Sequence, residues 1–186
     1  MEAHRPNWDE YFMTLAVIAS SRSTCLRGCI GAVLVKDNRV LSTGYNGSPA
    51  GQPHCLDVGC LQDERGKGCL RTVHAEQNAI AWAARHGISL AGCTCYLSSY
   101  TPYLACANLL VQVGCQRVVY RTLYRDDRAL TVLRDADIEL VEFKGQLVDV
   151  GSALQMHDEA MTRSSAGGCS CGSGGSPAPD ERTHGA

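Results

Sequence analysis

Apolar residues along this chain follow two alternating patterns, one with the period of a helix and one of short apolar runs. Residues 8–21, WDEYFMTLAVIASS, place apolar side chains every three to four positions, which predicts an amphipathic helix. Residues 72–87, TVHAEQNAIAWAARHG, are alanine-rich and end at a glycine, which is typical of a helix and its end. The same reasoning predicts further helices over residues 104–114 and 127–137.

The short apolar runs predict five strands. Asp37 and Asn38 separate the first two, which indicates a tight turn. Later strands alternate with helices, which favours an α/β fold with a mostly parallel sheet covered on both faces. The expected strands cover residues 29–37, 39–47, 93–99, 116–122 and 138–143.

The remaining segments predict loops and a tail. Glycine, proline and asparagine begin a long cysteine-bearing loop over residues 48–71. From residue 164 the chain reads SSAGGCSCGSGGSPAPDERTHGA, which has almost no side chain to bury. We therefore expect one domain over residues 1–163 and a disordered tail over residues 164–186.

Composition narrows the function classes. Hydrophobic residues make up 45% of the 186 residues, charged residues 19%, and the formal net charge is -2 with a pI of about 6.3. This balance gives no support for a nucleic-acid partner, which usually requires a basic face. No apolar run approaches the ~18 residues of a membrane helix, and the N-terminus lacks a signal-peptide pattern. We expect a cytoplasmic protein with no membrane partner.

Eleven cysteines are unusual for a reducing compartment. We interpret them as metal ligands and buried thiols rather than as disulfides. Four of them stand in apolar, strand-like or helix-like runs and are expected to be small core residues: Cys29, Cys93, Cys95 and Cys115.

Two segments match most of a metal-site motif. His74 and Glu76 form H-x-E at the start of the predicted 72–87 helix, and Cys106 follows in PYLAC. Zinc deaminases carry H-x-E with P-C-x-x-C, in which histidine and two cysteines bind zinc and the glutamate moves protons. A polar helix start is the plain alternative for His74 and Glu76. Tyr103 stands where the motif has its first cysteine.

The chain resembles the deoxycytidylate (dCMP) deaminase family, including bacterial members encoded in competence operons. The resemblance rests on RPNWDEYFM, STCLRGCIGAVLVKDNRVLSTGYNGSPAGQPHC, TVHAEQNAIAWAARHG and PYLACANLL, within residues 5–143. It implies a three-layer α/β/α cytidine-deaminase-like sandwich around five strands, assembled as a homo-oligomer, commonly a hexamer. The implied reaction converts dCMP and water to dUMP and ammonia at a catalytic Zn²⁺.

The resemblance also assigns residue roles. Glu76 becomes the proton shuttle, and His74 and Cys106 become zinc ligands. Ala75, between His74 and Glu76 in the sequence, would lie beside the substrate. Asn46 of GYNG would bind the deoxyribose hydroxyl, although the segment also reads as a simple turn. Trp82 and Arg85 fall where the family responds to dCTP and dTTP, and core packing is the alternative for Trp82.

The 5′-phosphate of dCMP needs hydrogen-bond donors. The segments RSTCLR and LYRDD offer four of them, although surface solvation is the plainer role for at least one arginine. The candidates are Ser23, Arg27, Tyr124 and Arg125.

Four further cysteines suggest a second, structural zinc, because four thiolates form a closed tetrahedral site. A metal would also order a loop that has little apolar content. Free loop cysteines are the alternative, and His54 is a possible substitute ligand. The four cysteines are Cys25, Cys55, Cys60 and Cys69.

Tyr103 leaves three interpretations open. A phenol, with an ordinary pKa of ~10, is a poor anionic ligand beside His74 and Cys106. The chain could be an active deaminase, or a silenced relative that binds nucleotides and regulates. In the third interpretation, a mutation or a sequencing error put Tyr103 in place of the cysteine of a working enzyme.

Overall fold

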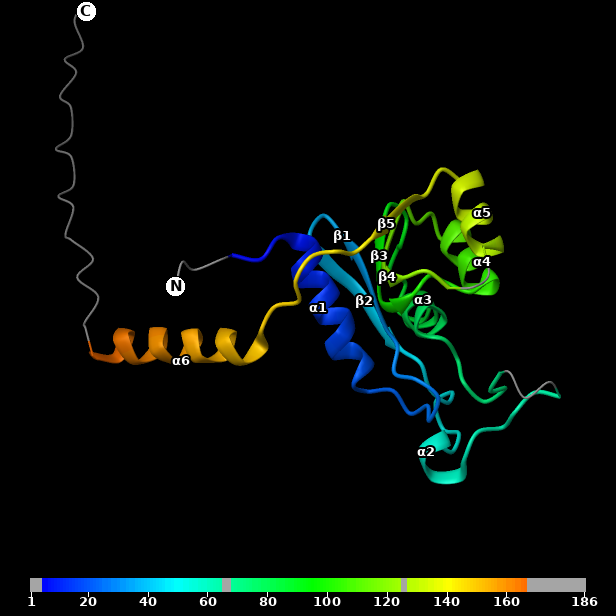
Figure 1. The fold of residues 1–186 in the computed structure, drawn as a ribbon, viewed down its shortest axis with the longest axis horizontal. Coiled ribbons are helices and arrows are strands. Elements are labelled where there is room, and N and C mark those ends of the chain that lie inside the picture. The colour runs from blue at the N-terminus through cyan, green and yellow to red at the C-terminus, as the bar shows by residue number, and fades with distance from the viewer. Residues whose placement is uncertain (1–4, 65–67, 125–126, 167–186) are drawn as a thin grey trace, which may run out of the picture. The chain divides into compact units, whose positions relative to one another are not determined.

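The computed structural model describes residues 5–64, 68–124 and 127–166, without the side chains of residues 160 and 163–166. Figure 1 shows a sheet with helices on both faces. The elements are α1 (Trp8–Ser20), β1 (Gly31–Lys36), β2 (Arg39–Tyr45), α2 (Cys55–Val58), α3 (Ala75–Arg85), β3 (Thr94–Tyr100), α4 (Leu104–Gln112), β4 (Arg117–Thr122), α5 (Arg128–Asp135), β5 (Glu139–Glu142) and α6 (Val150–Ala166). The chain divides into two compact units, residues 1–148 and 149–186.

The first unit contains one five-stranded sheet in the order β2-β1-β3-β4-β5. The pairings β1–β2 and β1–β3 are antiparallel, and β3–β4 and β4–β5 are parallel. The five-stranded α/β prediction is confirmed, but the sheet is mixed rather than mostly parallel. A tight turn with φ of 49° at Asp37 and 57° at Asn38 returns β2 directly against β1, so this pair has to be antiparallel.

Two apolar layers bury the sheet, and together with the strands they form the expected three-layer sandwich. On one face, Phe12, Met13 and Ala16 of α1 pack against residues such as Val33 and Val119. On the other face, α3, α4 and α5 supply small and branched side chains that pack against Leu34, Leu97 and Val118. The helices of this second face are the ones that carry the H-x-E and PYLAC segments.

Glycine allows two helices to approach the sheet closely. A Cβ on Gly31 of β1 would collide with the Ala16 carbonyl of α1, and a Cβ on Gly44 of β2 would collide with the Ala75 carbonyl of α3. Asn78 of α3 adds a hydrogen bond from its amide to the Tyr45 carbonyl, 2.9 Å long. The N-terminus of α3 is thereby fixed against the end of β2.

Polar contacts join α1 to the centre of the sheet. The Asp9 carboxylate accepts hydrogen bonds from both terminal nitrogens of Arg117, at 2.8 and 2.7 Å. It also accepts one from the Tyr96 hydroxyl at 2.7 Å. Arg117 keeps a second acidic neighbour, with its Nε 3.2 Å from a Glu139 oxygen. Hydrogen bonding to Arg117 lowers the pKa of Asp9, against the opposing effect of partial burial.

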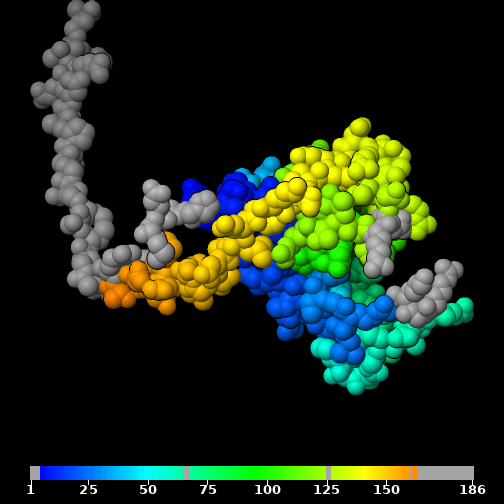
Figure 2. Space-filling view, viewed as in Figure 1, coloured from blue at the N-terminus to red at the C-terminus, as the bar shows by residue number. Residues whose placement is uncertain are grey.

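A pair of backbone hydrogen bonds closes the loop that follows β2. Gly47 N–H donates to the Val73 carbonyl at 3.1 Å, and Val73 N–H donates to the Gly47 carbonyl at 2.8 Å. The loop between them contains α2, a short helix that the sequence did not predict. In Figure 2 the cyan residues of this loop project from the surface at one edge of the domain.

Several other expectations meet the structure here. Cys93, Cys95 and Cys115 are buried as expected, but Cys29 is exposed because it precedes β1 instead of lying in it. The unpredicted α6 runs to Ala166, and the tail expected from residue 164 lies outside the described residues from residue 167 onward. In the part of the chain that the structure describes, no helix combines the length and apolarity needed to cross a bilayer.

Candidate active site

The first half of the site lies at the start of α3. His74 is the N-cap residue of this helix, in extended backbone geometry, and its N–H donates to the Gln77 side chain at 3.1 Å. Glu76 follows within the first turn and is only 5% exposed. Ala75 between them is fully buried. Because His74 has extended backbone geometry, its side chain does not follow the helical spacing and can reach the same point in space as Glu76.

The second half lies at the start of α4. Pro102 is fully buried, and Tyr103 occupies the N-cap position. Cys106 lies in the first turn, fully buried. Because α4 follows β3 at the sheet edge where α3 begins, Cys106 comes to the same place as the H-x-E segment.

The two halves meet. His74, Glu76 and Cys106 place their candidate ligand atoms within 4.8 Å of one another. The Cys106 Sγ lies 3.4 Å from His74 Nδ1. An imidazole nitrogen, a thiol sulfur and a carboxylate oxygen are all ligands that zinc accepts, so the donor set fits such an ion.

Burial raises the pKa of both acidic groups in this cluster. It raises the pKa of Glu76, against the smaller lowering effects of the local backbone N–H, the His74 charge and Cys106. It also raises the pKa of Cys106, with the neighbouring Glu76 adding to the effect. Two buried acidic groups in contact favour binding of a cation, which would relieve their mutual repulsion.

Tyr103 does not direct its hydroxyl to this cluster. Its ring packs edge-on against the His74 ring, with centroids 4.9 Å apart. Its hydroxyl donates to the Tyr124 hydroxyl at 2.7 Å, and 41% of the residue is exposed. Burial, followed by the Tyr124 hydrogen bond, raises the pKa of Tyr103 to about 12. At neutral pH the residue is therefore a protonated phenol.

The residues predicted to contact substrate lie in two groups. Asn46 is 6% exposed, and its side chain accepts from Ile30 N–H and donates to the Gly28 carbonyl, both at 2.8 Å. The Ser23 hydroxyl donates to the Asn46 carbonyl at 2.9 Å. These bonds make Asn46 a support for the segment before β1.

Arg27 and Tyr124 belong to the other group, beside Tyr103. The Arg27 charge lowers the pKa of Tyr103, although burial and Tyr124 outweigh it. The Tyr103 and Tyr124 rings also contact, with centroids 4.5 Å apart. Arg125, predicted with them, lies outside the described residues. The contact between Tyr103 and Tyr124 was not predicted, because no sequence pattern relates the two positions.

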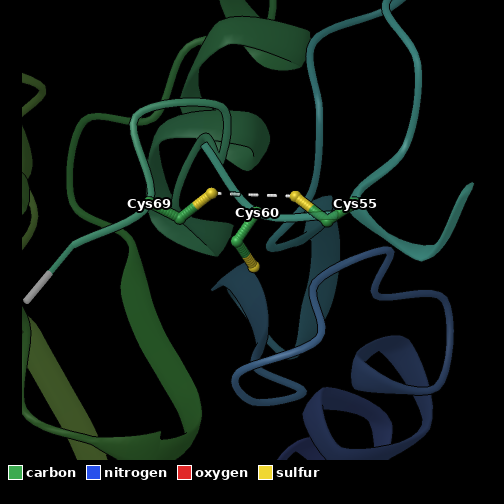
Figure 3. A group of neighbouring side chains, drawn as sticks. All are labelled: Cys55, Cys60 and Cys69. Carbon is green, nitrogen blue, oxygen red and sulfur yellow. Dashed lines mark hydrogen bonds between the residues drawn. The ribbon is translucent and has the colours of Figure 1, made fainter. Parts of the chain in front are cut away.

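A second group of sulfur atoms lies in the loop between Gly47 and Val73. Cys55, Cys60 and Cys69, here called the thiol cluster, place their sulfurs within 4.8 Å of one another. The sulfurs of Cys55 and Cys69 face each other (Figure 3) and are 3.7 Å apart, and Cys60 lies to one side of the line that joins them. This matches three of the four cysteines that the sequence suggested.

The fourth, Cys25, lies outside the thiol cluster. Its sulfur accepts the Arg27 N–H at 3.4 Å, in a segment held to Asn46 by the backbone of Thr24. His54, the suggested substitute, has 51% of its side chain exposed and lies 3.9 Å from an Asp57 oxygen.

Thr72 adds a contact that the sequence analysis missed. Its hydroxyl lies 3.9 Å from the Cys55 sulfur. Burial raises the pKa of Cys69, but hydrogen bonds from Thr72, the Arg71 backbone, Cys55 and the Leu61 backbone together lower it to about 6. In the sequence, only the position of Thr72 between Cys69 and His74 could have indicated this contact.

Trp82 does not pack in the core. It is 46% exposed and stacks on His86, with ring centroids 4.1 Å apart. The core-packing alternative for this residue is therefore wrong, and the aromatic pair stands on the outer face of α3.

Comparisons with known proteins place the chain in a family. The model of the cytidine and deoxycytidylate deaminase zinc-binding region matches residues 6–122. Deoxycytidylate deaminase of Saccharomyces cerevisiae is 39% identical over 144 residues, which cover 75% of this chain and 46% of the yeast protein. ComE operon protein 2 of Bacillus subtilis is 36% identical over 149 residues, covering 78% of this chain and 77% of that protein.

A solved structure shows the same fold. The dCMP deaminase of cyanophage S-TIM5, crystallised with dCMP and dUMP, superposes with a TM-score of 0.66 at 30% identity. The match covers 75% of this chain and 99% of the phage chain. This chain spans about half the length of the yeast relative, and nearly all of the phage enzyme has a counterpart in it. The chain belongs to the cytidine and deoxycytidylate deaminase family.

Proposed function

We propose that this chain binds dCMP and hydrolyses it to dUMP and ammonia at the His74–Glu76–Cys106 cluster. The observation that carries the proposal is the convergence of these three groups within 4.8 Å, from two helix starts that lie far apart in sequence. A family match over residues 6–122 and a phage relative crystallised with dCMP and dUMP support the choice of substrate.

Glu76 would carry the protons of the reaction. A zinc ion held by His74 and Cys106 would supply the lowered pKa of an attacking water. The Glu76 carboxylate accepts a proton from that water and delivers it to the ring nitrogen of cytosine. It would then take the remaining proton of the hydroxyl formed on the ring carbon and pass it to the amino group, which leaves as ammonia while the carbonyl of uracil forms. The burial of Glu76 favours this task, because its raised pKa brings proton gain and loss closer to neutral pH.

Tyr103 should make this reaction slow. Two protein ligands hold zinc less firmly than three, and even the loss of a group that only orients a ligand lowers metal affinity roughly 10–100-fold. Tyr103 cannot compensate as an anion at neutral pH, because its pKa is about 12.

The test is an ammonia-release assay on dCMP with this chain and with Tyr103→Cys. The variant should be at least about tenfold faster, since one further thiolate strengthens the site. Glu76→Gln in the Tyr103→Cys background should remove the activity, as a control for the proton shuttle. Equal rates would show that Tyr103 does not limit the rate of deamination. Inactivity of the Tyr103→Cys protein would refute the dCMP assignment.

Tyr103 also supports a second candidate function, in which the chain binds nucleotides without turnover. The observation in its favour is the Tyr103–Tyr124 hydroxyl pair, which occupies the phenol in a contact away from the metal ligands. Calorimetric titration with dCMP, dCTP and dTTP, beside the ammonia assay, separates the two functions. Nucleotide affinity together with no ammonia would favour the regulatory role.

We infer a structural zinc at the thiol cluster as well. Four sulfurs bound to zinc at ~2.3 Å stand about 3.8 Å apart in a tetrahedron, and Cys55 and Cys69 are 3.7 Å apart. The spacing is far from the ~2.05 Å of a disulfide. Cys60 would be the third ligand, and the fourth position is open to Cys25 or water after a local rearrangement. Free thiols remain the alternative outcome of metal analysis.

Self-assembly is the last part of the proposal. Trp8 and Tyr11 of α1 and Trp82 of α3 are each more than 40% exposed, so their apolar surfaces are accessible to a second copy of the chain. We propose that a homo-oligomer, a hexamer by family resemblance, covers part of these surfaces, and that Trp82 and Arg85 contact dCTP or dTTP. Light scattering with and without the nucleotides measures the assembly and any change that the nucleotides cause in it.

A further inference from the structure

The group of candidate metal ligands at the active site lacks one expected ligand, here called the gap, and contains one additional candidate, here called the spare group. The gap is the position of Tyr103, whose hydroxyl contacts Tyr124 at 2.7 Å instead of facing the cluster. The spare group is Glu76, which lies close enough to His74 and Cys106 to share an ion with them.

Charge also favours Glu76 as the ligand that replaces the cysteine missing at position 103. A histidine with two thiolates presents two negative charges to a divalent ion. A histidine with one thiolate and one carboxylate presents the same two, so Glu76 restores the charge that Tyr103 removes. Carboxylates are established zinc ligands, as in sites built from two histidines and a glutamate.

Burial strengthens this argument. Glu76 is 5% exposed and Cys106 is fully buried, so their charged forms lack water to solvate them. A buried carboxylate is stabilised by a cation or by hydrogen bonds, and a divalent ion in contact with it meets that need.

We propose that Glu76 is the third protein ligand of a divalent metal in this chain, together with His74 and Cys106. This inference rests on the proposed function only for the location of the site. It gives Glu76 two tasks that exclude each other at any moment, metal binding and proton transfer. Slow turnover then follows from an occupied proton shuttle and not only from a weak metal site.

The test is a cycle of four proteins: the chain itself, Glu76→Gln, Tyr103→Cys and the double variant. Metal affinity is measured by competition of a chromophoric chelator for Zn²⁺, and Co²⁺ absorption reports the ligand set. The thiol cluster is the same in all four proteins, so its metal cancels in the comparison. Cys106→Ser in both backgrounds is the positive control, because Cys106 is a ligand in either case.

The expected result is asymmetric. Glu76→Gln should weaken metal binding at least about tenfold in the original chain. The same change should leave the affinity unchanged in the Tyr103→Cys background, where the introduced thiolate supplies the third ligand. The Co²⁺ spectrum should change on Glu76→Gln only in the original chain. Thermal unfolding of the metal-free proteins checks that all four fold.

Two outcomes overturn the inference. One is an equal loss of affinity in both backgrounds, and the other is no loss in the original chain, including the case in which that chain binds no metal at this site. Failure of the proposed function looks different. A Tyr103→Cys protein that binds metal with the expected asymmetry and releases no ammonia from dCMP refutes the reaction and leaves the ligand inference standing.

Discussion

Replacement of Asp9 by asparagine should destabilise the domain, because Asp9 joins α1 to the centre of the sheet. The change removes a carboxylate that accepts three hydrogen bonds of 2.7 to 2.8 Å, two from Arg117 and one from Tyr96. An asparagine presents an NH₂ group toward donors on Arg117, so at least one of the three bonds is lost and the others weaken.

The size of the effect follows from exposure. A hydrogen bond to a charged group contributes about 1.5–3 kcal/mol when well buried, and an exposed ion pair contributes about 0–1 kcal/mol. The side chain of Asp9 is 32% exposed and that of Arg117 is 24% exposed, so the pair lies between these limits. Arg117 also retains Glu139, which prevents an orphaned charge. We expect a loss of about 2 kcal/mol in the free energy of unfolding.

The loss should depend on pH. The pKa of Asp9 is lowered in the folded state, so its contribution is complete above the unfolded-state pKa of about 3.9 and disappears as the pH falls through the folded value. The gap between the two proteins should therefore be full at pH 7 and shrink as the pH falls below about 3.9.

Urea unfolding at several pH values, with the metal load held constant, measures this gap. Asp135→Asn, an exposed change on α5, is the matched control and should leave the free energy of unfolding within about 0.5 kcal/mol of the original chain. A gap between Asp9→Asn and the original chain that is absent at pH 7, or that persists unchanged at pH 3, would refute the reasoning.

Three further changes test other contacts. Gly44→Ala should lower both the unfolding temperature and the metal affinity, because the new Cβ pushes the start of α3 away from β2, whereas Gly28→Ala has open space and should change neither. Cys69→Ser should reduce bound zinc by one ion per chain in mass spectrometry, and an unchanged zinc content would exclude the thiol cluster as a metal site. Tyr124→Phe removes the partner of the Tyr103 hydroxyl and should bring the pKa of that phenol below about 12, which ultraviolet pH titration measures.

Sequence patterns predicted most elements of the first unit because each has a local signal. The Asp37–Asn38 turn is one example, since both residues adopt positive φ and asparagine and aspartate tolerate this region. The order of strands has no such local signal. Chain order did not reveal that β3 lies beside β1 in the antiparallel sense, so the sheet was expected to be mostly parallel.

The candidate site also combines features that have a local sequence signal with features that have none. The convergence of His74, Glu76 and Cys106 follows from two motifs at helix starts, and the sequence indicated it. Cys25 lies outside the thiol cluster, next to Thr24, whose N–H donates to the Asn46 carbonyl, and the spacing of cysteines along the sequence does not encode such a backbone contact. The direction of the Tyr103 hydroxyl depends on Tyr124, which is 21 residues away.

The pair of hydrogen bonds between Gly47 and Val73 makes the loop between them an exchangeable module. Both bonds lie at its base, next to Asn46 on one side and His74 on the other. Loop-closure free energy grows only slowly with length, by about 0.6 kcal/mol for each doubling. The parts of residues 48–72 outside the thiol cluster could therefore be lengthened, shortened or replaced by a sensor peptide while the two flanking residues keep their places, which makes this loop a natural site for grafting.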